Sequence, residues 1–356
     1  MKLSSRKLTG LILAAALPVG VQAADNVTVY GKVRTSVDFT DNGTGDAKNV
    51  SSNASRLGFK GNEDLGNGLR AIFQMETLVT VDGSAALLFG TPRNSYVGLM
   101  SGFGTMVLGV TDNAYKLATG KLDIYSDSMG DFNAIIGNVS GATTPFNERE
   151  PDSINYWSPK MEGFQFLAAY RVDEDATVKQ DRYSLAGVYE EGAYYASLAY
   201  ESHANEANAT GSISSTATGR IFDTNAWTLG LGYIFNHDNT KVNFVYEDLA
   251  QDGAATVMDR TAWYLALAHK MGSNTFKVAY ANADDNDVGP NTGASWFVVG
   301  VDHSLSKRTT VYALYTQTDN DSGARYGLGT GGSTGAVVPT LGKDPSTLSI
   351  GINHDF

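Results

Sequence analysis

The chain has 356 residues, of which 39 are Gly, 18 are Tyr, 15 are Phe and none is Cys. Without Cys it can form no disulfide scaffold and no Cys-ligated zinc or iron–sulfur site, and a hydrophobic fraction of 42% excludes a wholly disordered protein. A formal net charge of −12 makes it a poor candidate for nucleic-acid binding. The length suits either two soluble domains or one large barrel.

The first 23 residues have the pattern of a secretory signal peptide. A basic start at Lys2, Arg6 and Lys7 precedes the apolar stretch 8–17, and a small-residue cleavage site ends at Ala23. The apolar stretch is shorter than the roughly 20 residues that a membrane-spanning helix needs. We therefore expect residues 1–23 to be removed and residues 24–356 to form a single domain with 23 bases against 38 acids, a net charge of −15.

From residue 27 onward, apolar and polar residues alternate with a period of two, which is the pattern of a strand with one apolar face. The first run places on its apolar face Val27, Val29, Val33, Val37 and Phe39. Its other face carries Tyr30, Lys32, Arg34 and Asp38, and the alternation returns over residues 56–60 and 69–76. Such strands suit a position between lipid and a wet lumen, while a soluble sandwich with an apolar core is the alternative.

Counting these runs along the chain favours the membrane barrel. Sixteen runs, each about as long as a tilted membrane strand, begin near Asn26, Val50, Asn67, Pro92, Phe103, Asp152, Phe164, Asp181, Gly192, Phe222, Asn239, Val257, Ser273, Gly293, Lys307 and Ser346. Short turns alternate with longer polar connections, such as those at 41–50, 112–150 and 319–345. An up-and-down barrel segregates its connections in this way, with short turns on one rim and long loops on the other.

Aromatic residues near the ends of these runs predict the two girdles that border a membrane. They are Tyr170, Tyr189, Tyr194, Tyr195, Tyr200, Trp227, Tyr233, Phe235, Trp263, Tyr264 and Phe276. Because soluble β-proteins also carry aromatics at strand ends, this pattern adds support to the barrel and does not decide it.

Several linked motifs resemble the general diffusion porins of Gram-negative outer membranes. They are Val29-Tyr30-Gly31-Lys32-Val33, Ser55-Arg56-Leu57-Gly58-Phe59-Lys60-Gly61, Glu63-Asp64-Leu65-Gly66-Asn67-Gly68-Leu69, Phe73-Gln74-Met75-Glu76, Arg93-Asn94-Ser95-Tyr96-Val97-Gly98-Leu99 and Phe103-Gly104. The terminal Phe356, preceded by alternate apolar residues, is similar to the assembly signal of outer-membrane barrels.

The resemblance covers nearly the whole of residues 24–356. It implies an all-β fold, a transmembrane up-and-down antiparallel barrel of sixteen strands, assembled as a homotrimer by the barrel-assembly machinery in contact with outer-membrane lipid and lipopolysaccharide. It further implies a water-filled channel for passive diffusion of ions and small hydrophilic solutes, narrowed by the third external loop folded into the pore.

The connection 112–150 is the longest in the chain and is the candidate for that constriction loop. Its apolar residues are Tyr115, Leu117, Leu122, Ile124, Tyr125, Met129, Phe132, Ile135, Ile136 and Phe146. This is too much apolar surface for a loop surrounded by water, so we expect the segment to pack against the barrel wall. A disordered external loop is the alternative.

Charged residues on the predicted inner face would set the field of the pore. By alternation, the inward bases are Lys32, Arg34, Arg56, Lys60 and Arg70, and by resemblance the basic constriction cluster is Lys32, Arg56, Arg93 and Arg149. Candidate opposing acids from the loop are Asp123, Asp127 and Asp131. The alternatives are that an inward Arg only pairs with a lumen carboxylate and that a loop Asp only caps a turn. Seven bases against Asp38, Glu76 and up to three loop acids predict a weakly anion-preferring or near-neutral pore.

Other chemistry is sparse in this sequence. The five His residues have no metal-ligand spacing, no catalytic motif occurs, and Asp284-Asp285-Asn286-Asp287 lacks the rest of a calcium-binding loop. We therefore expect no cofactor, no metal site and no enzymatic activity. A passive pore is the leading function, with an adhesion or structural barrel or a solute-specific channel as alternatives.

Overall fold

The computed structural model describes residues 26–84, 89–138, 146–173, 180–207, 221–252, 259–287, 289–329 and 332–356. The expected signal peptide, residues 1–23, lies outside the described residues.

The described part of the chain is almost entirely β-structure. Its strands are β1 (Asn26–Asp41), β2 (Asp46–Ser52), β3 (Arg56–Gly66), β4 (Leu69–Val79), β5 (Phe89–Pro92), β6 (Ser95–Ser101), β7 (Gly104–Asp112), β8 (Arg149–Trp157), β9 (Phe164–Arg171), β10 (Arg182–Glu191), β11 (Tyr194–Ala207), β12 (Ile221–Phe235), β13 (Thr240–Asp252), β14 (Arg260–Met271), β15 (Asn274–Ala283), β16 (Ala294–Ser304), β17 (Thr309–Asn320) and β18 (Ser346–Asp355). Its helical turns are α1 (Ala114–Thr119), η1 (Gly120–Leu122) and η2 (Phe132–Ala134). Within these residues no helix has the length and apolarity to cross a membrane.

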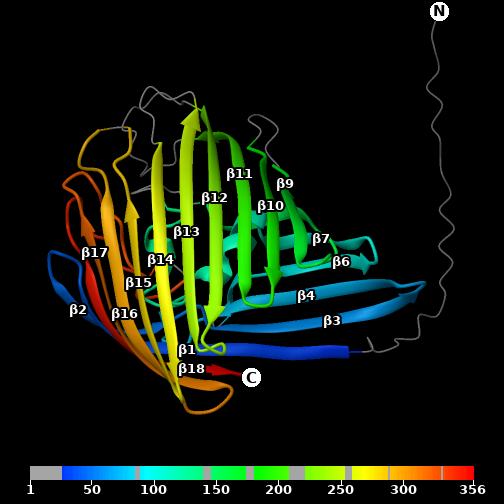
Figure 1. The fold of residues 1–356 in the computed structure, drawn as a ribbon, viewed down its shortest axis with the longest axis horizontal. Coiled ribbons are helices and arrows are strands. Elements are labelled where there is room, and N and C mark those ends of the chain that lie inside the picture. The colour runs from blue at the N-terminus through cyan, green and yellow to red at the C-terminus, as the bar shows by residue number, and fades with distance from the viewer. Residues whose placement is uncertain are drawn as a thin grey trace, which may run out of the picture.

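These strands form one antiparallel sheet that closes on itself, because β1 pairs with β18 (Figure 1). The 18 segments occupy sixteen positions around the barrel, since β2 and β3 both pair with β1, and β5 and β6 both pair with β4. The sixteen-stranded barrel expected from the sequence is therefore confirmed.

Local sequence explains the tight turns on one rim. Between β3 and β4, Asn67 and Gly68 have φ angles of 53° and 76°, which is the geometry of the two-residue turn that Asn-Gly favours. The first long connection is shorter than expected, because β1 and β2 pair as far as Asp41 and Asp46, which leaves only residues 42–45 as the loop.

Each strand turns one face outward and one inward. On β12, Trp227, Leu229 and Leu231 are exposed, while Ala226 and Thr228 are buried. An outward band of large apolar side chains is what a barrel presents to lipid. The girdle expectation was wrong for two aromatics: Tyr195 and Tyr264 are buried on the inner face, whereas the other nine are partly or fully exposed.

Residues 113–138, here called the inner segment, pack against inward-facing side chains of the barrel wall that includes β11 and β13. Its apolar residues Tyr115, Leu122 and Ile135 are buried. The Oη of Tyr195 on β11 donates to the carbonyl of Ala118 (2.6 Å), and the amide of Asn243 on β13 donates to the carbonyl of Leu122 (2.6 Å). The apolar composition thus led to the right conclusion, that this segment packs against the wall.

The last loop, residues 321–345, also packs onto the wall and the inner segment, which the sequence pattern did not indicate. Leu328 is buried and forms an isolated β-bridge with Val337. Ser333 bridges to Asn53 and its Oγ lies 3.5 Å from the Sδ of Met129. Long-range packing of this kind is invisible to periodicity, because it joins residues more than 200 positions apart.

The strand pattern is interrupted at two places, one directly before Arg56 and one at Arg93. At residues 53–55 the chain leaves the ladder, Ala54 has φ 52°, and its N–H donates to the carbonyl of Gly332 (3.1 Å). At residues 93–94 the second break separates β5 from β6. Irregular backbone of this kind is tolerated at membrane depth where it is buried in protein or lines a wet cavity.

Candidate functional site

A cavity of about 740 Å³ lies between the inner segment and the wall that carries the first strands. Its lining includes three of the seven predicted bases, Arg56, Arg93 and Arg149, together with all three predicted acids, Asp123, Asp127 and Asp131. The structure therefore brings together, around one cavity, charged residues that are up to 93 positions apart in the sequence.

Asp127 is the point at which the inner segment meets the basic wall. Its Oδ2 accepts from Nη1 of Arg34 on β1 at 2.8 Å and from Nη2 of Arg56 on β3 at 2.5 Å. Arg34 also donates to the carbonyl of Ser126 (3.2 Å). This contact links the inner segment to the side of the barrel opposite β11 and β13. Because hydrogen bonds between charged partners are stronger than those between neutral partners, the link is a strong one.

Arg93 is held by Glu76 on the neighbouring strand β4. Its Nε donates to Oε1 of Glu76 (2.8 Å), and the Oη of Tyr30 donates to the other carboxylate oxygen (2.9 Å). A guanidinium fixed by a carboxylate keeps its remaining N–H groups in a defined direction.

Arg149 lies at the start of β8 and is held by Asp112 and Asn94. Its Nη2 is 2.8 Å from Oδ1 of Asp112, and its Nε donates to Oδ1 of Asn94 (3.0 Å). The amide of Asn94 in turn donates to Asp112 (2.8 Å). The second strand break thus supplies the residue that orients this arginine.

None of the other three predicted bases lines the cavity, although Lys32 is the register partner of Arg56 across β1 and β3. Lys32 is 3.9 Å from Asp355 at the barrel seam, and Lys60 lies over the ring of Tyr30, 5.2 Å from its centroid. Arg70 is exposed at the turn end of β4, where it pairs in register with Asp64. Eight residues of strand separate Arg70 from Leu78, the partner of Arg56, which is about 27 Å.

Asp123 and Asp131 are buried and bind backbone N–H groups of the inner segment itself. Asp123 accepts from the N–H of Tyr125 (2.8 Å), and Asp131 accepts from the N–H groups of Asn133 (2.9 Å) and Asp127 (3.0 Å). Burial raises the pKa of Asp131 to about 6 and that of Asp123 well above its usual range. These two acids therefore have the turn-capping contacts that were the alternative to an electrostatic role.

Sequence reasoning missed four charged residues that line the cavity: Asp112, Lys116, Lys121 and Glu148. Burial, followed by repulsion from Glu150, raises the pKa of Glu148 to about 7. All four belong to the connection 112–150, and Lys116 lies in α1 and Lys121 in η1, so strand alternation could not assign these lysines a face.

A buried network on β13 and β14 fixes the inner segment. Glu247 accepts from the Oη of Tyr115 (2.8 Å), from the N–H of Gly137 (2.8 and 3.0 Å) and from Nη2 of Arg260 (3.0 Å). Arg260 also donates to the carbonyl of Ile135 (3.0 Å). The charges of Glu247 and Arg260 neutralise each other, and the same two groups form hydrogen bonds with the backbone of the inner segment. These buried hydrogen bonds give the segment a defined position on this wall.

A closed barrel with an apolar outer face and a charged inner cavity defines an outer-membrane channel protein. The family model for the Gram-negative porin matches residues 10–323, and the chain belongs to this family. It is accordingly a porin of the outer membrane, through which ions and small hydrophilic solutes diffuse passively.

Similar proteins agree with this assignment. The chain is 27% identical to outer membrane porin protein 32 of Delftia acidovorans over 99% of both chains, and 30% identical to major outer membrane protein P.IB of Neisseria sicca over 86% of this chain and 91% of the relative. Among solved structures, the anion-selective porin from Comamonas acidovorans has a TM-score of 0.81 and 25% identity, covering 93% of this chain and 99% of that one. Family membership thus indicates a channel rather than an enzyme.

Proposed function

We propose that the connection 112–150 is the constriction loop of this channel and that the cavity beside it is the narrowest part of the pore, with a weak preference for anions. The observation that carries the proposal is the contact of Asp127 with Arg34 and Arg56, because it joins the inner segment to the basic wall. A charged group at a narrow point focuses the field that a passing ion experiences.

The charge balance of the cavity supports an anion preference. Five bases line it, Arg56, Arg93, Lys116, Lys121 and Arg149, and so do five acids, Asp112, Asp123, Asp127, Asp131 and Glu148. The two sets are not equally charged at pH 7, because the pKa of Glu148 is about 7 and its carboxyl group is only partly ionised there. The bases therefore exceed the ionised acids. The structurally similar porin from Comamonas acidovorans is anion-selective, which points in the same direction.

The experiment is a measurement of the zero-current potential of single channels in a salt gradient. The double variant Arg56→Glu and Arg93→Glu changes the cavity charge by four units and is expected to move this potential clearly towards cation selectivity. The matched control, Asp284→Lys and Asp285→Lys, makes a charge change of equal size and opposite sign in an external loop, where salt screens charge within about 8 to 10 Å. A shift of equal size in both variants would contradict the role of these two arginines.

Deletion of most of residues 113–138 tests the constriction directly. Single-channel conductance is expected to rise while the barrel still inserts, because the narrowest cross-section dominates the resistance. Unchanged conductance in an inserted deletion variant would place the constriction elsewhere.

We further propose that residues 1–23 direct export and are then removed. The barrel-assembly machinery inserts the remaining chain and recognises a signal that ends at Phe356. The inserted protein forms a homotrimer in contact with lipid and lipopolysaccharide. A trimeric solved relative, the OmpT of Vibrio cholerae, supports an oligomer through its fold, with a TM-score of 0.70 at 17% identity. On a detergent gel, unheated protein is expected to migrate as a trimer and boiled protein as a chain of about 36 kDa. A purely monomeric band after mild extraction would contradict the trimer. We assign no catalytic role to the barrel.

A further inference from the structure

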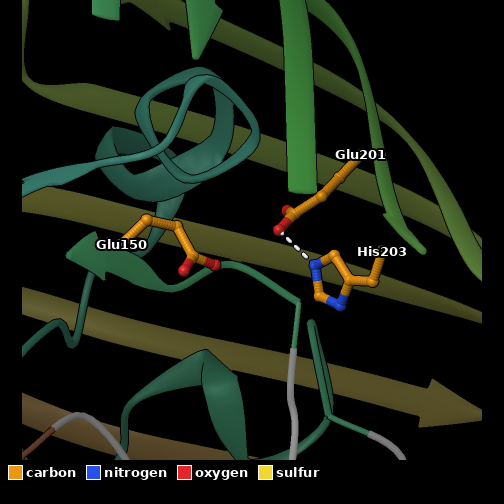
Figure 2. Close-up of side chains that lie close together, drawn as sticks. All are labelled: Glu150, Glu201 and His203. Carbon is orange, nitrogen blue, oxygen red and sulfur yellow. Dashed lines mark hydrogen bonds and ion pairs between the residues drawn. The ribbon is translucent and has the colours of Figure 1, made fainter. Parts of the chain in front are cut away.

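Three potential metal ligands converge on the inner wall beside the two ends of the connection 112–150 (Figure 2). Glu201 and His203 are two residues apart on β11, so both point to the same face of the strand. Glu150 comes from β8, and the strands β9 and β10 lie between β8 and β11 in the barrel wall. One ligand atom from each side chain lies within 4.8 Å of the other two.

These groups are buried, with exposed fractions of 4% for Glu150, 1% for Glu201 and 0% for His203. Nε2 of His203 forms a hydrogen bond with Oε1 of Glu201 (2.7 Å), so the two groups already converge on one point of the inner wall. Oε1 of Glu201 also accepts from the amide of Asn113 (2.8 Å). The backbone N–H of Asn147 also binds this carboxylate, while its Oε2 is buried and has no hydrogen-bond partner of ordinary geometry among the described residues. A buried carboxylate oxygen without a partner is costly, and a cation would compensate it.

Charged groups of both signs surround the cluster. Nη1 of Arg182 on β10 is 2.9 Å from Oε1 of Glu150 and 3.4 Å from Glu148, and Nη1 of Arg171 on β9 is 3.6 Å from Oε2 of Glu150. Two guanidinium groups and the ammonium group of Lys116, which interacts with Glu148 and Glu201, thus face three carboxylates, those of residues 148, 150 and 201. A carboxylate oxygen has two lone pairs, so the contacts of Glu150 with arginine do not use up its capacity as a ligand.

The residual space at the cluster has the size of one small occupant. A cavity of about 10 Å³ adjoins Glu150 and Glu201, close to the volume that a single water needs. A larger anion or an organic solute does not fit there.

We propose that Glu150, Glu201 and His203 bind one divalent transition-metal ion of the zinc class. An imidazole with two carboxylates favours Zn²⁺ over Mg²⁺ or Ca²⁺, which prefer oxygen ligands alone. Three protein ligands leave a fourth position, which water in the adjoining cavity fills.

The site links metal binding to the ends of the connection 112–150. Asn113, the residue before α1, donates to Glu201, and the ring of Phe146 stacks on the imidazole of His203 with centroids 4.6 Å apart. Glu150 follows Arg149, which lines the cavity. A bound ion therefore holds the beginning and the end of the connection 112–150 against β11 and restrains its movement.

Isothermal titration calorimetry tests the proposal with chelator-treated, detergent-purified full-length protein and Zn²⁺ as the titrant. Wild type is expected to bind one Zn²⁺ per chain, with no competition from excess Mg²⁺. His203→Gln and Glu201→Gln are each expected to weaken binding at least about tenfold, since loss of even an outer partner of a metal ligand costs 10- to 100-fold. The matched control His303→Gln removes an exposed imidazole on β16 and is expected to bind as wild type does.

Only variants that keep the heat-modifiable migration of a folded barrel are compared. Absence of saturable Zn²⁺ binding by wild type overturns the proposal, whatever the variants do. So does binding that survives unchanged in both folded variants, because the ion then lies elsewhere. Loss of binding in His303→Gln alone would assign the ion to the surface of β16 and would also overturn it.

Discussion

Gly31 and Phe356 close the barrel through two backbone hydrogen bonds, 3.1 Å from the N of Gly31 to the O of Phe356 and 3.0 Å from the N of Phe356 to the O of Gly31. The ring of Phe356 occupies the space beside the glycine, where an added Cβ would lie 2.3 Å from its Cζ. The seam therefore requires the absence of a side chain at residue 31 as well as the aromatic ring at residue 356.

Gly31→Val is expected to lower the free energy of unfolding by about 1–3 kcal/mol, because the added methyl groups must displace the Phe356 ring or the β1–β18 seam. Guanidinium unfolding of the barrel in detergent measures the change. Gly187→Val on β10 is the matched control, since an added Cβ there meets nothing within 4 Å. Equal destabilisation of the two variants would show that the seam has no special packing requirement.

Asp127→Asn is expected to increase the preference for anions. The substitution removes the carboxylate that pairs with Arg34 and Arg56, so one negative charge disappears at the basic wall while the side chain keeps its shape. The zero-current potential in a potassium chloride gradient measures the effect. Asp284→Asn makes the same charge change in an external loop and is expected to have a smaller effect. If Asp127→Asn moved the potential towards cations, the proposed pore field would have the wrong sign.

Selectivity is expected to depend on pH through Glu148. Its pKa of about 7, with that of Asp131 at about 6, means that both side chains lose negative charge as the pH falls from 8 to 5. The cavity becomes more positive over this range, so anion preference should increase. Recording the zero-current potential at several pH values checks this.

Glu148→Gln is expected to remove most of the change between pH 8 and pH 6, since the remaining titration of Asp131 lies lower. Glu191→Gln, at the short turn between β10 and β11, is the control and should retain the full dependence. A pH profile that is identical in Glu148→Gln and wild type would assign the titration to another group.

The buried pair of Glu247 and Arg260 is expected to be needed for a stable inner segment. Arg260→Met leaves the Glu247 carboxylate buried without its cation, which costs about 3–5 kcal/mol for pairs of this kind. Denaturant unfolding should show the loss, and single-channel recordings should show larger current fluctuations. The double variant Arg260→Met and Glu247→Gln removes both charges and should recover part of the stability. If the double variant were no more stable than Arg260→Met, the loss would come from packing rather than from an unpaired charge.

Much of the fold could be predicted from the sequence because lipid and water select different side chains on alternate positions of every strand. This is why the residues around Val29 and Lys32 indicated both the strand and its orientation. The two breaks at residues 53–55 and 93–94 could not be predicted in this way, since they depend on contacts with Gly332 and with Glu76 that periodicity does not encode.

The candidate site was less predictable. Alternation placed Arg56 and Arg70 on the same face, but it carries no information on height along the strand, and the structure places them at different levels. The sequence pattern did not indicate that Glu150 and His203 lie close together, because two strands separate them in the barrel wall. Contacts between a loop and a wall, such as Tyr115 with Glu247, join residues 132 positions apart and become visible only once the barrel is closed.

The packing of the last loop also bears on how this protein can diversify. Surface loops of bacterial proteins ordinarily tolerate substitution and insertion because they contact only water. Here Tyr326 and Leu328 are buried, while Val338 and Leu341 are 76% and 61% exposed. Substitutions at Val338 and Leu341 are therefore expected to be tolerated, whereas changes at Tyr326 and Leu328 would also require changes in the residues on which they pack.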